Sequence, residues 1–130
     1  MENKLINLQK LFPEIKKYFS PVIIGEVNDV YVKLAKIKGQ KVPWHIHDNE
    51  DELFYIIKGS LIMEIENEPG FPINEGSMYI VKKGINHRVY STEECLIMLI
   101  ENKSTKHTGD IKAEITKPIE EQLKGIKESQ

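Results

Sequence analysis

A series of short extended runs, separated by turn residues, fills the middle of this chain and limits the folds that it can adopt. Between Val22 and Ile100, apolar side chains alternate with polar ones or cluster for a few residues before the next turn. Many short strands at such spacing are typical of a β-sandwich or a barrel. We therefore expect an all-β domain with strands at residues 22–27, 30–38, 42–47, 53–58, 61–66, 78–81, 88–90 and 96–100.

The turn between the runs at 53–58 and 61–66 contains a glycine. Glycine adopts positive φ without steric cost, so Lys58, Gly59 and Ser60 predict a tight hairpin that joins these two strands.

Two segments outside these runs have helical character. The first twenty residues carry apolar side chains at i, i+3, i+4 spacing, interrupted by Pro13, which fits one broken helix or two short ones. After a weakly patterned stretch, residues 118–127 have the pattern of a short amphipathic helix with a proline in its first turn. The expected organisation is a helical segment at 1–20, a barrel at 21–103 and a tail with a short helix at 104–130.

Composition excludes several classes of protein. A chain of 130 residues is long enough for one domain with a proper core, and its net charge of -2 leaves no basic footprint for nucleic acid. No apolar run approaches the about 18 residues of a membrane-spanning helix, and the N-terminus lacks the features of a signal peptide, so we expect a cytoplasmic protein. Cys95, the only cysteine, precedes an apolar run and is expected to be a small buried hydrophobe.

Three of the four histidines form a pattern that indicates a metal site. His45 and His47 lie two residues apart, so on an extended strand both side chains would point to the same face. Glu52 begins the next apolar run and His87 follows a glycine-bearing turn, so both could reach that face from neighbouring strands. Histidine and carboxylate are common ligands of divalent transition metals. The acidic residues that compete with Glu52 are expected to form a solvated turn: Asp48, Glu50 and Asp51.

The spacing of these residues resembles the motifs of the cupin family. The first motif is matched by Gly39, His45, His47, Glu52 and Gly59, and most of the second by Gly76, Gly84 and His87. The resemblance spans about residues 22–101 and implies a small antiparallel jelly-roll barrel, the architecture that the strand pattern also favours. The chain departs from the second motif at two positions that are not ligands: Lys82 replaces the usual proline, and Ser91 the usual asparagine.

The resemblance also implies a ligand set, with three imidazoles and one carboxylate from His45, His47, Glu52 and His87. Such a set leaves two positions of an octahedron open and suits Mn, Fe, Ni, Co or Zn in the divalent state. The ligands alone do not choose among these metals.

Three functions fit this site. The first is non-redox, metal-assisted chemistry on a small polar metabolite such as a sugar derivative, by isomerisation, epimerisation or ring opening. The alternatives are a non-haem Fe(II) dioxygenase and a binding module for a small ligand without chemistry. No motif assigns a general acid or base; position alone offers Lys33, Lys41, Tyr55, Lys58 and Tyr79.

The apolar residues between and beside His45 and His47 suggest a subunit contact. On a strand at 42–47, Val42, Trp44 and Ile46 would form an apolar face opposite the histidines, so we expect a homodimer that buries Trp44. Arg88 follows His87 and should point away from the site, toward a salt bridge or the dimer contact. His107 is expected in a surface loop.

Overall fold

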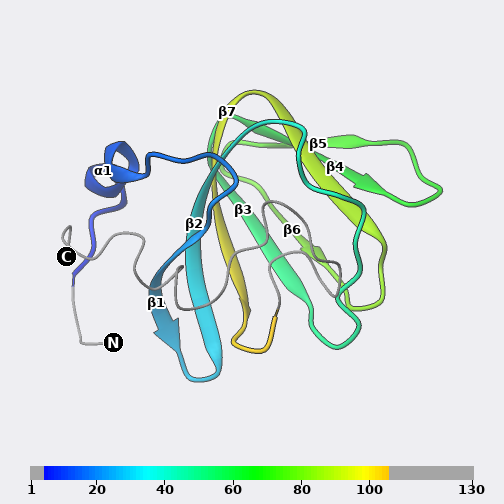
Figure 1. The fold of residues 1–130 in the computed structure, drawn as a ribbon, viewed down its shortest axis with the longest axis horizontal. Coiled ribbons are helices and arrows are strands. Elements are labelled where there is room, and N and C mark those ends of the chain that lie inside the picture. Colours follow the sequence, from blue (N-terminus) through cyan, green and yellow to red (C-terminus); the bar gives the residue numbers. More distant parts are fainter. Residues whose placement is uncertain (1–4, 106–130) are drawn as a thin grey trace.

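The computed structural model describes residues 5–105 and consists mainly of antiparallel β-strands (Figure 1). A short α-helix, α1 (Leu8–Leu11), runs into a 3-10 turn at Phe12–Glu14 that contains Pro13, as expected for two short helical pieces. The strands, in chain order, are β1 (Val22–Val27), β2 (Val30–Gly39), β3 (Glu52–Lys58), β4 (Ser60–Ile65), β5 (Phe71–Asn74), β6 (Met78–Val81) and β7 (His87–Asn102). His107 and the expected helix at 118–127 lie outside the described residues.

Two sheets share the long strand β7. One sheet has the order β1-β2-β7-β3-β6, and β4 pairs with both β5 and the first residues of β7. All pairings between these strands are antiparallel. The expected all-β barrel is therefore confirmed. Figure 1 shows α1 outside the strands, on the side of β1 and β2.

β7 replaces the two separate strands that we expected at 88–90 and 96–100. Its register with β2 continues from Asn102 to Ser91, with an irregularity near Gly39. Thr92, Glu93 and Glu94 in its middle are exposed, and this polar stretch interrupts the apolar pattern in the sequence.

The expected hairpin at residues 58–60 is wrong. β3 pairs with β6 and β7, whereas β4 pairs with β5 and β7, so the two strands that flank Gly59 do not pair with each other. Gly59 has a φ of 90°, and a Cβ at this position would lie 2.8 Å from the backbone oxygen of Glu94. The glycine serves a close backbone approach where the chain passes from one sheet to the other.

The expected strand at residues 42–47 is also wrong. Only His45 makes a β-bridge there: its N–H donates to the His87 carbonyl and its carbonyl accepts from the His87 N–H, each over 3.0 Å. Pro43 has no N–H to donate to a ladder, which explains why regular pairing does not extend. Because the segment is irregular, Val42 turns into the core instead of sharing the outer face with Trp44 and Ile46.

β5 was not among the expected strands, and Pro72 lies within it. This strand pairs only with β4 and is therefore an edge strand, where a missing N–H is tolerated.

Two apolar cores hold the fold together. The inner core fills the barrel and includes Phe54, Ile56, Leu61, Met63 and Ile97. The outer core lies where the N-terminal segment packs on β1 and β2, and consists of Leu11, Ile15, Val22, Ile24 and Leu34. Cys95 is buried in the inner core as expected, and burial raises the pKa of its thiol to about 11. No helix among the described residues is long and apolar enough to cross a membrane.

Candidate metal centre

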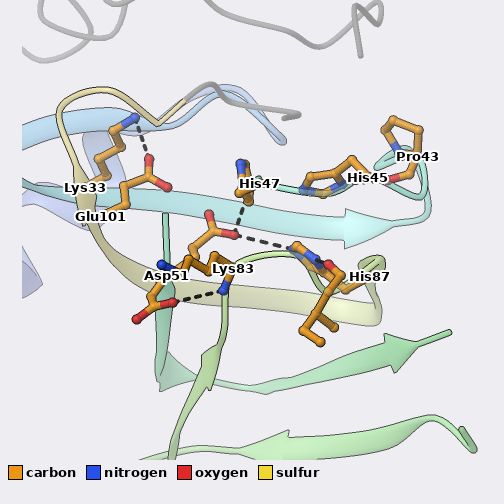
Figure 2. A network of polar contacts seen from close by, with 10 residues as sticks. Lys33, Pro43, His45, His47, Asp51, Lys83, His87 and Glu101 are labelled. Atoms are coloured by element: carbon orange, nitrogen blue, oxygen red, sulfur yellow. Dashed lines mark hydrogen bonds and ion pairs between the residues drawn. The ribbon is translucent and has the colours of Figure 1, made fainter. Parts of the chain in front are cut away.

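The structure brings His45, His47, Glu52 and His87 together inside the barrel. One nitrogen or oxygen atom from each residue lies within 4.8 Å of those of the others. All four side chains are buried, His87 most completely at 1% exposure. Figure 2 shows the three imidazoles directed toward a common point. We call these four residues the ligand cluster.

Separate segments of the chain deliver these side chains to one place. Glu52 is the first residue of β3 and His87 the first of β7. The segment that carries His45 and His47 is tied down by the bridge between His45 and His87, and by the Gly84 N–H, which donates to the His47 carbonyl over 2.9 Å. The backbone thus fixes the histidines although they do not lie on a regular strand.

Backbone carbonyls orient two of the imidazoles. His45 Nδ1 lies 2.8 Å from the Pro43 carbonyl oxygen, and His87 Nδ1 lies 2.9 Å from that of Ile85. Since a carbonyl oxygen only accepts, a neutral imidazole in this arrangement carries its proton on Nδ1 and leaves the Nε2 lone pair for a metal.

The polar atoms at the centre of the cluster fit a divalent cation. Glu52 Oε1 lies 3.3 Å from His47 Nε2 and 3.5 Å from His87 Nε2. Glu52 Oε1 and His87 Nε2 make no hydrogen bond to any described residue. Buried polar atoms normally find a partner, and a cation among these lone pairs would provide one.

The electrostatic environment favours the protonation states that metal ligands need. Burial, assisted by the neighbouring His87, lowers the pKa of His45 to about 4, so this imidazole is neutral at pH 7. Burial alone would raise the pKa of Glu52, but its contacts with His47 and His87 hold it well below the usual range. The cluster therefore combines an anionic carboxylate with an imidazole that does not compete as a cation.

A buried ion pair beside the cluster was not expected from the sequence. Lys33 Nζ lies 2.6 Å from Glu101 Oε1, and both side chains are almost fully buried (Figure 2). Glu101 is the cross-strand neighbour of Glu52 in the β3–β7 register. Burial and the Glu52 carboxylate raise the pKa of Glu101, while Lys33 opposes the shift. The only signals in the sequence were a lysine within the apolar run of β2 and a glutamate after that of β7.

Of the five candidate acids and bases, only Lys33 is buried. Tyr55, Lys41 and Lys58 are exposed, and Tyr79 is half-buried with its ring 5.1 Å from that of Phe71. Lys33 is occupied by its ion pair, so we assign no catalytic acid or base.

The residues around the second motif have structural contacts. As expected, Arg88 makes a salt bridge, with its Nε 2.8 Å from Glu64 Oε1, and its guanidinium also lies 4.8 Å from the centre of the Trp44 ring. Lys82 pairs with Asp51 over 2.7 Å, and Asp51 also accepts a bond from the Lys83 N–H.

Comparison with known proteins finds the same fold and family features. The family model for the cupin domain matches residues 35–101. The chain is 29% identical over 104 residues to the protein YdbB of Bacillus subtilis, which covers 80% of this chain and 91% of YdbB.

Two solved structures align over most of the chain. A cupin-2 domain protein from Shewanella frigidimarina has a TM-score of 0.72 and 35% identity, covering 76% of this chain and 95% of that one. The protein NMB1881 from Neisseria meningitidis has a TM-score of 0.69 and 30% identity, covering 77% of this chain and 100% of that one.

Proposed function

This chain belongs to the cupin family, and from that premise we propose that it is a metal-dependent enzyme whose ligand cluster binds one divalent transition metal ion. The ion is one of Mn, Fe, Ni, Co or Zn. The substrate is a small metabolite that reaches the metal through polar oxygen atoms, and the reaction is a non-redox rearrangement such as isomerisation, epimerisation or ring opening. The observation that carries the proposal is the convergence of four buried ligand atoms within 4.8 Å.

Each residue of the cluster has a definite task in this proposal. His45 and His87 present Nε2 because carbonyl groups hold their Nδ1 atoms. Glu52 supplies the negative charge that offsets the cation. When bound, the metal supplies a Lewis acid that polarises a carbonyl or hydroxyl group of the substrate. Phe54, which is buried beside the cluster, helps to keep bulk water from it.

Metal analysis of the purified protein tests the proposal. We expect one ion per chain in the wild type and none in His47→Ala, because this substitution removes a ligand from the centre of the cluster. Asp48→Ala is the matched control, since Asp48 is an exposed neighbour outside the cluster. Full metal occupancy in His47→Ala, with the fold intact by circular dichroism, would refute the assignment.

Metal replacement and oxygen uptake distinguish the types of reaction. Turnover with Mn(II) or Zn(II) and no oxygen consumption supports the proposed chemistry. Activity only with Fe(II), coupled to oxygen consumption, identifies a dioxygenase instead. Saturable binding of a metabolite without any product identifies a binding module.

We also propose a homodimer with Trp44 near the interface. Trp44 is half-buried under the Arg88 guanidinium, and the neighbouring Ile46 is 37% exposed. Together they leave apolar surface on the outer side of the ligand-bearing segment, which a second subunit would cover. Light scattering at micromolar concentration should give twice the chain mass, and a clean monomer would contradict this proposal.

A further inference from the structure

A small cavity adjoins the ligand cluster inside the barrel. Its volume is about 40 Å³, and three of its twelve lining residues belong to the cluster: His45, Glu52 and His87. The other nine are all apolar, among them Phe19, Ala35, Val42, Phe54, Val89 and Ile97. The cavity thus has a polar end at the cluster and apolar walls elsewhere.

The lining selects against polar groups away from the cluster. A hydroxyl group placed against these walls would lose its hydrogen bonds to water and regain none from side chains. An apolar group would leave water without such a loss. A polyhydroxylated sugar therefore matches this lining less well than a molecule with one polar end and one apolar end.

The volume limits the length of the apolar group. An apolar cavity of about 150 Å³ binds benzene, which has six carbons, so a space of about 40 Å³ suits a much shorter group. The space accordingly suits a chain of two or three carbons.

Phe19 closes part of this cavity in a strained backbone conformation. Its φ is 55°, a left-handed value that is unfavourable for an aromatic residue, yet its side chain is only 4% exposed. The Phe19 N–H donates to the Lys36 carbonyl over 2.8 Å, and the hydroxyl of the preceding Tyr18 donates to Glu94 over 2.8 Å. These contacts on both residues hold the ring of Phe19 in the wall of the cavity.

From this geometry we infer that the ligand of the metal centre carries a short apolar group of two or three carbons, which the cavity receives, and that Phe19 sets the length of that group. This inference rests on the proposed metal site and narrows its substrate class. The molecule binds the metal through oxygen atoms at one end and places a small hydrocarbon group among the apolar walls.

The test uses Co(II)-loaded protein and a series of 2-oxo acids, which chelate a metal through carboxylate and ketone oxygens. The visible absorption of Co(II) reports their binding without any need for turnover. We expect affinity to rise about fourfold per carbon from pyruvate to 2-oxobutyrate to 2-oxovalerate, and not to rise further for 2-oxohexanoate. 2-Oxobutyrate should bind about tenfold more tightly than hydroxypyruvate, which has a hydroxyl group in place of its terminal methyl group.

Variants in the cavity wall should shift this length limit in opposite directions. Phe19→Ala enlarges the space, so this variant should bind 2-oxohexanoate about fourfold more tightly than 2-oxovalerate. Ala35→Val fills the space from another wall and should weaken 2-oxovalerate about tenfold while leaving pyruvate unchanged. Phe12→Ala is the matched control, because Phe12 packs on the outer core and does not line the cavity.

The outcomes separate this inference from the proposal beneath it. If the wild type takes up no Co(II), the proposed metal site fails and the inference fails with it. If Co(II) binds but affinity is independent of chain length, or hydroxypyruvate binds as well as 2-oxobutyrate, only the inference is overturned. Should Phe19→Ala not fold, Ala35→Val decides: an unchanged length limit in that variant contradicts the inference.

Discussion

The barrel contains two buried polar centres that lie side by side and differ in how their charges are balanced. The Lys33–Glu101 pair joins an ammonium group to a single carboxyl group over 2.6 Å, so each finds its partner within the chain. The ligand cluster has one carboxylate and three imidazoles, with polar atoms that make no hydrogen bond to any described residue. Glu52 and Glu101 are cross-strand neighbours, so the difference comes from the residues that face each carboxylate. One centre is complete within the folded chain, whereas the other would be completed by the cation that we propose.

The largest effect on stability is expected when the buried Lys33–Glu101 ion pair is broken. Lys33→Met leaves Glu101 buried without its cation and should lower the free energy of unfolding by about 3 to 5 kcal/mol. Urea denaturation of metal-free protein measures this loss. The double variant Lys33→Met/Glu101→Leu should recover most of it, because a buried ion pair and an apolar pair of similar volume have similar stability. If Lys33→Met is as stable as the wild type, Lys33 and Glu101 do not form the buried ion pair described above.

Acidification should destabilise the metal-free protein through its ligand cluster. The pKa of His45 is about 4 in the folded state and near 6.5 when unfolded, so between these values only the unfolded chain takes up the proton. The contribution of His45 to the free energy of unfolding is therefore complete above pH 6.5. It falls by about 3 kcal/mol as pH drops to 4. Urea denaturation across this range, with EDTA present, tests the effect. The His45→Gln variant should lose correspondingly less stability over this pH range. An equal loss in both proteins would contradict the assignment of the effect to His45.

Coupling between the two centres should appear in metal affinity. In the double variant Lys33→Met/Glu101→Leu, Glu52 loses its polar neighbour, so we expect the affinity for Co(II) or Zn(II) to fall about tenfold. Titration against a competing chelator measures the change. Unchanged affinity would show that the two centres are independent although Glu52 and Glu101 are cross-strand neighbours.

An exposed ion pair provides the smallest effect and the control for the comparison. Arg88 and Glu64 keep about a third and a quarter of their side-chain surfaces exposed. Glu64→Gln should cost less than about 1 kcal/mol of stability, because water screens the pair. Metal affinity should not change. A loss as large as that of Lys33→Met would remove the distinction between buried and exposed pairs.

The four cluster residues could be predicted from sequence, whereas their neighbours could not. The spacing of His45, His47, Glu52 and His87 follows a recognisable motif, and the structure brings all four together. Lys33 and Glu101 meet only because β2 pairs with β7, and that register is a property of the tertiary fold. Nothing in the local pattern around either residue identifies its partner.

The sequence signals for turns and strands likewise did not reveal which segments pair in the fold. Gly59 marked the break between two strands, but a glycine does not reveal which strands pair on either side of it. The alternation at 42–47 placed both histidines inward, although the segment is not a strand and Val42 faces the core with them. Local pattern identified which side chains are buried more reliably than how the backbone brings them there.

The long strand β7 has a consequence for how the protein folds. It carries His87 at its first residue and Glu101 next to its last, and it pairs with β2, β3 and β4. These partners are distant in sequence, so their pairing is expected late and slowly during folding. Until β7 is in register, His45 and His47 are not joined by His87, so the four ligands do not yet converge. Metal capture at full affinity should therefore coincide with the last step of folding, and its rate would report when the barrel closes.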